Sequence, residues 1–298
     1  MPHRNDRTRS CVRARQFSLH PRTTPWMREN KYIMIPRVMR LPSSTSGNRL
    51  AALHKHSGLE MIVSHRHKFI FVKTGKTGGS SVEMQLSLFC GPEDIVTPGM
   101  EAKDPKYAQF LESRRPRNLR IPLHRAAYVS LPIPPFVPLE KHHRPRVTFY
   151  DHMPAFRIQR GLPKKIWNEY FKFTVVRNPY DRAISQYFWN NRKTSDHTKE
   201  RVNDYILNKI PPVMLTNWFM YASGQNVLVD HFIRYEELES GLRATLDRLG
   251  IKEPIALPDA KAGLRPRTAG HRDYLNPAAR AYVEKHAKAE IDYFGYEW

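Results

Sequence analysis

Short apolar runs alternate with amphipathic segments along most of the chain. A continuous apolar run such as Phe69-Ile-Phe-Val72 is typical of a strand that is buried on both faces of a parallel sheet. The pattern predicts strands at 68–73, 147–150, 172–176 and 228–235, and helices at 79–89, 164–170, 181–191, 236–249 and from Asn276-Pro277 onward. Strands that alternate with helices predict an α/β fold, in which helices flank a parallel sheet.

Two of the predicted helices have clear sequence signals. An asparagine followed by proline is a favourable start for a helix, because Asn caps the first turn and proline suits the first helical position. The helix that begins there keeps one face apolar, with Ala279, Val283, Ala287, Ile291 and Phe294. In the predicted helix 181–191, the residues that we expect to face the core are Ile184, Tyr187 and Phe188.

Two stretches do not fit this alternation. Residues 1–48 are polar and basic and have no periodic apolar positions, so we expect them to be disordered. Met27 or Met34 is an alternative start of translation. We assign residues 49–298 to a single domain. Within it, residues 92–146 form a long, irregular, proline-rich and basic insertion, which we expect to be either a substrate-binding excursion or mobile.

Charge indicates the kind of partner. The formal net charge of the 298 residues is +21, and it is concentrated in two stretches. Residues 1–50 contain eleven Lys or Arg and two acids, and residues 101–146 contain ten and four. Basic stretches favour anionic partners such as a nucleotide, an acidic glycan or nucleic acid, although an ordinary basic surface remains the alternative.

The two cysteines, Cys11 and Cys90, argue against a disulfide framework and favour a reducing compartment. No apolar run approaches the ~20 residues that a membrane-spanning helix needs, and the N-terminus has no apolar core of a secretory signal. We therefore expect a cytoplasmic protein without a membrane span. The arginine-rich start also resembles an organelle transit peptide, which is the alternative.

The first candidate site follows the first apolar run, in Lys73-Thr-Gly-Lys-Thr-Gly-Gly-Ser-Ser81. Its glycines allow positive φ angles and close approach of the backbone to a ligand. Ser80 and Ser81 can cap the helix that follows, whose N-terminus favours an anion. A Walker A loop would need a glycine five positions before Gly75, where the chain has Ile70. The segment is therefore interpreted as a shorter phosphate-binding turn.

The second candidate site has the same layout about a hundred residues later. Phe173-Thr-Val-Val176 leads into Arg177-Asn-Pro-Tyr-Asp-Arg-Ala-Ile-Ser185. One anion-binding turn of this kind is common, whereas two in one domain indicate a ligand with two separate anionic groups.

Together these motifs resemble the sulfotransferases that use 3′-phosphoadenosine 5′-phosphosulfate, and most of all the carbohydrate branch and its soluble bacterial members. The resemblance runs from about His67 to Trp298, and one departure is Gly75, where the commonest form of the loop has proline. It implies the sulfotransferase fold and a site in which the second segment binds the 3′-phosphate through Arg177 and Ser185. The 5′-phosphosulfate would be held by Lys76, Thr77, Gly78, Gly79, Ser80 and Ser81.

The resemblance also implies the chemistry. A sulfuryl group moves in line from the phosphosulfate to a hydroxyl, and we expect Lys76 to stabilise the leaving oxygen without a metal. His152 is the expected base, because it follows a predicted strand on the side where ligands gather in open α/β sheets. Asp151 is its rival, or orients the ring. Arg182 is either a second anion ligand or, as we favour, a surface residue.

The resemblance extends to a late loop, from which Arg272 or Tyr274 would contact the nucleotide. The acceptor is expected to be a carbohydrate, with an acidic glycan as one candidate, and no stable nucleic-acid partner is expected. Two other classes remain as alternatives: a basic nucleic-acid-binding module, which is disfavoured because the basic stretches are poor in aromatic residues, and a nucleotide kinase on a degenerate P-loop scaffold.

Overall fold

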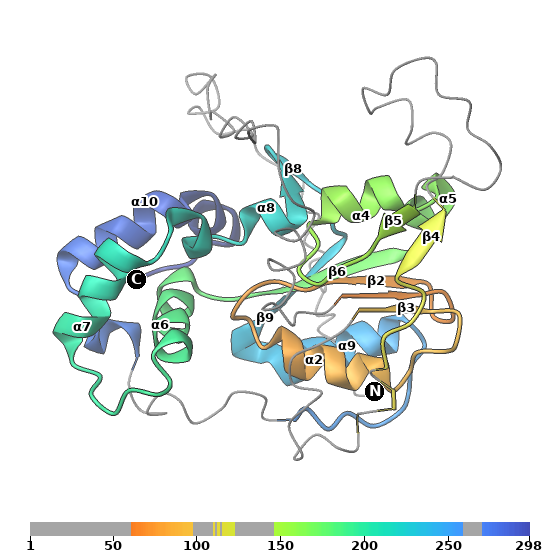
Figure 1. Cartoon of the computed structure of the whole chain (residues 1–298), viewed down its shortest axis with the longest axis horizontal. Helices are drawn as coiled ribbons and strands as arrows, with labels where there is room; N and C mark the ends of the chain where they lie inside the picture. The colour runs from red at the N-terminus through yellow and green to blue at the C-terminus, as the bar shows by residue number, and fades with distance from the viewer. Residues whose placement is uncertain (1–60, 98–109, 111, 114, 123–145, 259–269) are drawn as a thin grey trace, which may run out of the picture. The chain divides into compact units, whose positions relative to one another are not determined.

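The computed structural model describes residues 61–97, 110, 112–113, 115–122, 146–258 and 270–298 (Figure 1). These residues belong to one compact unit that spans Leu53–Trp298. The predicted disordered segment 1–48 and most of the predicted insertion lie outside the described residues.

A five-stranded mixed sheet forms the centre of the fold, with the strand order β3-β1-β2-β6-β9. The three strands β2, β6 and β9 are parallel, whereas β1 runs antiparallel to both of its neighbours. The strands are β1 (Ile62–Ser64), β2 (Phe69–Val72), β3 (Ile95–Val96), β6 (Phe171–Val176) and β9 (His231–Arg234). The predicted α/β class is confirmed, and the antiparallel strands β1 and β3 extend the parallel part at one edge.

Alternate residues of the strands pack into two hydrophobic layers. Phe69, Phe71 and Phe173 face helices α2 (Gly79–Ser87) and α9 (Leu238–Arg248). Ile70 and Val72 face the opposite layer, which contains α4 (Ala155–Gly161), α5 (Lys164–Glu169) and α8 (Trp218–Tyr221). Figure 1 shows these two sets of helices on opposite sides of the sheet. Because β2 is buried on both sides, it has the continuous apolar sequence of a central strand.

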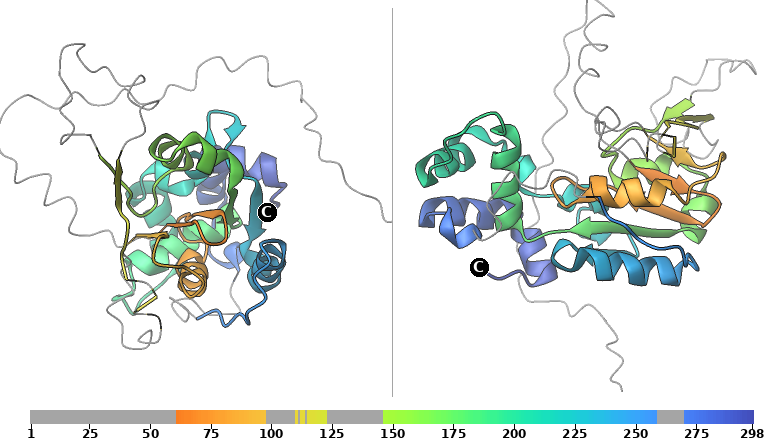
Figure 2. Two further views of the ribbon diagram at one scale, coloured as in Figure 1. Left: turned by 90° about the vertical axis from the view of Figure 1, so that its right-hand side faces the viewer. Right: turned by 90° about the horizontal axis from the view of Figure 1, so that it is seen from below.

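A second helical cluster lies beyond the end of β6, as Figure 1 and the right-hand view of Figure 2 show. Helices α6 (Pro179–Asn190) and α10 (Pro277–Phe294) share a core there with α7 (Lys199–Asp204) and the π-helix η4 (Tyr205–Lys209). The Asn276 side chain accepts a hydrogen bond from the Ala279 amide, and Pro277 is the first residue of α10, as predicted. Two short 3₁₀ helices complete this half, η5 (Pro212–Leu215) and η7 (His271–Asp273), whereas η6 (Tyr235–Glu237) leads into α9.

Two small antiparallel ribbons stand apart from the central sheet. One pairs β4 (Arg120–Pro122) with β5 (Arg146–Thr148), and the other pairs β7 (Ala222–Ser223) with β8 (Asn226–Val227). The predicted strand 147–150 was therefore misplaced. It corresponds to β5, whose partner is β4, and it takes no part in the parallel sheet. The predicted strand 228–235 is confirmed only over its second half, as β9.

Candidate active site

The two predicted anion-binding segments emerge from the same edge of the sheet. Strands β2 and β6 are adjacent and parallel, with Val72 opposite Thr174. The first segment follows the carboxyl end of β2, and the second follows the carboxyl end of β6. Ligands of open α/β sheets bind at this edge. The topology therefore brings together two segments that are about a hundred residues apart in the sequence.

Two cationic side chains connect the segments directly. The Arg177 guanidinium donates a hydrogen bond from Nη1 to the Lys76 carbonyl oxygen, at 3.3 Å, and it lies 4.0 Å from the centre of the Tyr235 ring. The Lys76 ammonium in turn lies 4.7 Å from the centre of the Trp189 ring, near the end of α6. Lys76 and Arg177 thus place two positive charges at one end of the sheet.

The turn after β2 has an unusual backbone. Lys76 has a φ of 62° and Gly78 a φ of 74°, so both lie in the left-handed region. At Gly78 a Cβ atom would lie 3.0 Å from the Tyr235 ring, so only glycine meets both the conformational and the steric requirement. Helix α2 begins directly after it, at Gly79.

The N-terminus of α2 differs from the prediction in one respect. Its N-cap is Gly78, which has no side chain, and Ser80 and Ser81 lie inside the first turn instead of capping it. The prediction that these serines cap the helix was wrong, because the αL conformation of Gly78 already starts the helix two residues earlier. A helix end without a side-chain cap presents amide N–H groups and positive partial charge to an anion.

Internal hydrogen bonds fix the base of this turn. Thr77 is fully buried, and its hydroxyl donates to the Thr74 carbonyl oxygen at 3.2 Å and lies 2.8 Å from the Thr74 hydroxyl. The Thr74 hydroxyl donates to the carbonyl oxygen of Val175 in the neighbouring strand. The hydroxyl of Thr77, predicted to contact the 5′-phosphosulfate, is thus engaged in holding the turn together.

A residue that the sequence analysis did not identify also holds the turn. Asn217 is buried, and its side-chain amide makes two hydrogen bonds with Gly75. Its Nδ2 donates to the Gly75 carbonyl oxygen at 2.9 Å, and the Gly75 amide donates to its Oδ1 at 3.1 Å. Residues 217 and 75 are 142 positions apart, so no sequence motif connects them.

His152 reaches the same turn from a different direction. Its Nδ1 lies 2.8 Å from the Lys73 carbonyl oxygen. A carbonyl oxygen only accepts hydrogen bonds, so Nδ1 carries the proton, and in the neutral ring the lone pair is on Nε2. The φ of His152 is 45°, which is uncommon for a residue with a side chain. Asp151, its rival, is buried.

The remaining predicted residues lie around this region. Ser185 is half-buried within α6. Arg272 donates a hydrogen bond to the carbonyl oxygen of Trp298. The ring of Tyr274 packs edge-to-face against Phe188, with the ring centres 5.5 Å apart.

Arg182 is not a surface residue, and the prediction that favoured this reading was wrong. The side chain is buried, and its Nη2 lies 2.9 Å from Oε2 of Glu290 on α10. It also donates to the carbonyl oxygen of Leu215. A buried arginine requires a charged partner, and the partner here comes from a helix more than a hundred residues later, which local sequence could not indicate.

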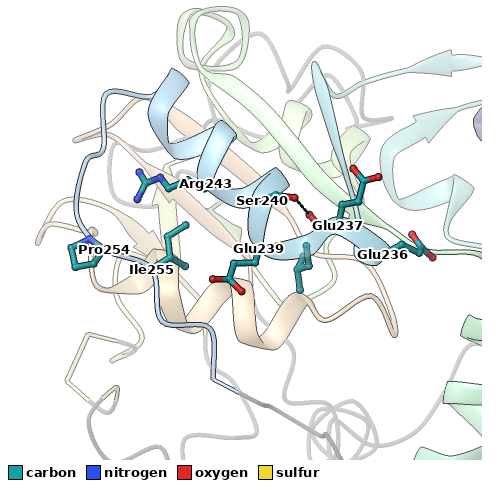
Figure 3. Close-up of a pocket in the computed structure, with 8 residues that line it drawn as sticks. Glu236, Glu237, Glu239, Ser240, Arg243, Pro254 and Ile255 are labelled. Atoms are coloured by element: carbon teal, nitrogen blue, oxygen red, sulfur yellow. Dashed lines mark hydrogen bonds between the residues drawn. The ribbon is translucent and has the colours of Figure 1, made fainter. Parts of the chain in front are cut away.

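A separate pocket opens beside the start of α9 (Figure 3). Three glutamates contribute to its wall, with Arg243 as the one basic residue among the residues that line it: Glu236, Glu237, Leu238, Glu239, Ser240, Arg243, Pro254 and Ile255. An excess of carboxylates repels an anionic ligand. The basic edge formed by the two turns is therefore the better candidate site for a nucleotide phosphate.

The donor set at that edge fits a ligand with separated anionic groups. It combines a helix N-terminus without a side-chain cap, the hydroxyls of Ser80 and Ser81, and the side chains of Lys76 and Arg177, which anions attract. The fold and this edge define an α/β enzyme of the kind that binds a nucleotide by its phosphates.

A comparison with protein families matches residues 59–297 of the chain to a family described as "Sulfotransferase family". The chain belongs to this family, and it is a transferase that depends on 3′-phosphoadenosine 5′-phosphosulfate. A comparison with curated proteins found no match. Within the described part of the chain, no helix combines the length and apolar character required to cross a membrane.

Proposed function

We propose that the protein transfers the sulfuryl group of 3′-phosphoadenosine 5′-phosphosulfate to a hydroxyl of a carbohydrate. The observation that supports this site best is the hydrogen bond between Arg177 and the main chain of Lys76, at 3.3 Å. It joins the two segments that would bind the two ends of one nucleotide. In this proposal Arg177 and Ser185 bind the 3′-phosphate. The 5′ end is bound by the turn and the first turn of α2, with Lys76, Thr77, Gly78, Gly79, Ser80 and Ser81.

Lys76 would stabilise the charge that develops on the leaving phosphate oxygen. Its cationic side chain is near the start of α2, so the ammonium and the helix N-terminus act on the same anionic group. The contact with Trp189 keeps the ammonium on the side of the turn that faces α6. Because the bound donor supplies an already activated sulfuryl group, the chain has to provide mainly position and positive charge.

His152 is proposed as the base that accepts the proton of the acceptor hydroxyl. The hydrogen bond from Nδ1 to the Lys73 carbonyl oxygen fixes the tautomer, and it directs the basic Nε2 away from the turn. A general base contributes about 10²–10⁴-fold to the rate of such a step. Asp151 is the alternative base, and substitution of each residue in turn distinguishes the two assignments.

The carbohydrate acceptor rests on the resemblance of the motifs and on the net charge of +21. A basic protein attracts acidic acceptors, so an acidic glycan is the first class to test. The two cysteines of the chain favour a reducing, cytoplasmic location. Cell fractionation would test this part of the proposal.

Two observations argue against the nucleotide kinase alternative. Ile70 is buried inside β2, where a Walker A loop would need its first glycine. Asp230 follows the apolar run 227–229, as the metal-binding acid of a kinase follows its strand, but it lies at the amino end of β9 and pairs with Lys172 at 2.9 Å. A metal-binding acid of a kinase would be needed at the opposite, carboxyl edge.

Donor binding is tested by calorimetric titration with adenosine 3′,5′-bisphosphate. We expect the wild type to bind and Arg177→Ala to bind at least tenfold more weakly, since a charge-assisted hydrogen bond is worth about 1.5–3 kcal/mol. Arg201→Ala is the matched control, because Arg201 is an exposed arginine paired with Asp196. Equal affinity of Arg177→Ala and Arg201→Ala would remove Arg177 from the site.

Catalysis is tested with sulfur-labelled donor and a panel of acidic and neutral glycans. We expect His152→Ala to lower turnover by about 10²-fold or more, and to leave the affinity for the bisphosphate within about threefold. Asp151→Asn should retain most of the turnover. The assignment of the base is wrong if His152→Ala turns over at close to the wild-type rate.

A further inference from the structure

A buried polar network connects α10 to the turn after β2. Its first member is Asn217, whose side-chain amide donates one hydrogen bond to the main chain of Gly75 and accepts another from it. Its own main-chain amide donates to Oε2 of Glu290 at 3.0 Å. Asn217 is only 6% exposed, and Glu290 only 2%. A polar group that is buried to this degree keeps its position only when its partners are fixed.

Glu290 is fixed by three donors. Arg182 and the Asn217 amide donate to Oε2, and the Tyr221 hydroxyl donates to Oε1 at 2.8 Å. Burial, together with the neighbouring carboxylate, raises the pKa of Tyr221 well above its usual value, so the hydroxyl remains a donor. Arg182 belongs to the second anion-binding segment. The network therefore connects the second segment to the first through α10.

The two bonds to Gly75 determine the direction of the next peptide group. All peptide bonds of the described residues are trans, so the C=O of Gly75 and the N–H of Lys76 point in opposite directions from one plane. Because Asn217 holds the Gly75 carbonyl, the Lys76 N–H is directed away from Asn217. On its other side, the Lys76 carbonyl is held by Arg177. Both peptide groups that flank Lys76 are thus fixed.

This arrangement accounts for the backbone of Lys76. A φ of 62° is unfavourable for a residue with a side chain and persists only where the surroundings impose it. We propose that Asn217 is a positioning residue of the transferase: it holds Gly75, and through it Lys76, in the geometry that receives the 5′ end of the donor. The inference rests on the proposed function of this turn, and Asn217 itself touches neither substrate.

The test compares two nucleotides. Adenosine 3′,5′-bisphosphate would use both segments, whereas adenosine 3′-monophosphate would use only the second. We expect Asn217→Ala to bind the bisphosphate about tenfold more weakly and to bind the monophosphate within twofold of the wild type. Asn217→Asp keeps the shape and the acceptor for the Gly75 amide but loses the donor, and it provides the same test if Asn217→Ala does not fold.

The chain offers a control in Asn118, which is exposed. Its side-chain amide also makes two hydrogen bonds to main-chain atoms, the carbonyl oxygens of Pro92 and Asp94. Asp94 accepts from the amides of His65 and Arg66, between β1 and β2, so this asparagine acts at the opposite end of β2. Asn118 has a φ of 52°, so Asn118→Gly removes the bonds without introducing strain. This variant should bind both nucleotides as the wild type does.

Two results would overturn the proposal. One is a folded Asn217→Ala whose affinity for the bisphosphate stays within twofold of the wild type. The other is an equal loss for both nucleotides, which would indicate a general structural role. A wild type that binds neither nucleotide would instead refute the donor site itself, and the positioning role of Asn217 with it.

Discussion

The ion pair between Arg182 and Glu290 is expected to dominate the stability of the helical half of the fold. The Nη2 and Oε2 atoms are 2.9 Å apart, and each side chain is only 3% exposed. In Arg182→Met the Glu290 carboxylate would stay buried and would keep only two neutral donors, the Asn217 amide and the Tyr221 hydroxyl. Leaving one member of such a pair without its partner costs about 3–5 kcal/mol. We expect the free energy of unfolding of Arg182→Met to be lower than that of the wild type by this amount.

The matched control is an ion pair of almost equal length on the surface. Arg201 lies 3.0 Å from Asp196, and the two side chains are 58% and 54% exposed. Exposed pairs contribute about 0.2–1 kcal/mol, so Arg201→Met should be nearly neutral. The comparison separates burial from distance, because both pairs join an arginine to a carboxylate at nearly the same distance.

The assay is urea unfolding at pH 7.5, followed by far-ultraviolet circular dichroism, with stability taken from the midpoint and the slope. The double variant Arg182→Met/Glu290→Met should be more stable than Arg182→Met, because it removes the isolated charge. Equal midpoints of Arg182→Met and Arg201→Met would refute the burial of Arg182 and its role in holding the segment around Leu215.

Four further predictions follow from individual residues and from the expected chemistry. Lys76→Met should lower kcat by about 10²-fold or more, measured with labelled donor at saturation, if its charge stabilises the leaving oxygen. Gly161→Ala should lose about 1–3 kcal/mol in urea unfolding, because its Cβ would lie 2.8 Å from Cγ1 of Val147; an unchanged midpoint would contradict the packing beneath α4. Burial raises the pKa of the Cys90 thiol to about 12, so iodoacetamide should modify it at pH 8 at least about a hundredfold more slowly in the native than in the unfolded protein, as peptide mapping would show. Turnover should be unchanged by a metal chelator, since no metal is expected in the reaction; a loss that magnesium restores would contradict this.

The elements that the sequence predicted well are those with strong local signals. Strands β2 and β6 have apolar sequences because neighbours cover both of their faces, and α10 begins at a cap that two adjacent residues, Asn276 and Pro277, specify. Strands β1 and β3 have only three and two residues, too few for a periodic pattern. Strand β5 has the sequence Arg-Val-Thr and was predicted as part of 147–150; it pairs with β4, a partner in another part of the chain that local sequence does not indicate.

The candidate site also contains residues that the sequence could identify and residues that it could not. Each anion-binding segment is a continuous stretch, so sequence could identify Lys76 and Arg177. The residues that hold these segments are distant along the chain: Asn217 is 142 positions from Gly75, and Glu290 is 108 positions from Arg182. Such contacts depend on the packing of α10 against α6, which no local pattern specifies.

Backbone strain is concentrated where the predicted chemistry is. Among the described residues, four with side chains have positive φ: Lys68, Lys76, Asn118 and His152. Two of these are the proposed catalytic residues, and each takes part in a hydrogen bond at the turn that follows β2. His152 donates to the Lys73 carbonyl oxygen, and the carbonyl oxygen of Lys76 accepts from Arg177.

Neither segment would hold such a conformation alone, because a left-handed residue with a side chain costs about 1–3 kcal/mol. The cost is offset by bonds that come from other parts of the chain, so the geometry of the turn is a property of the assembled fold. A substitution at Asn217 or Arg177 should therefore alter the conformation of Lys76 although Lys76 itself is unchanged. The two proposed catalytic residues are held by separate contacts: Arg177, after β6, holds the Lys76 carbonyl, and the Lys73 carbonyl, after β2, holds the His152 ring. Loss of one contact should leave the other residue in position.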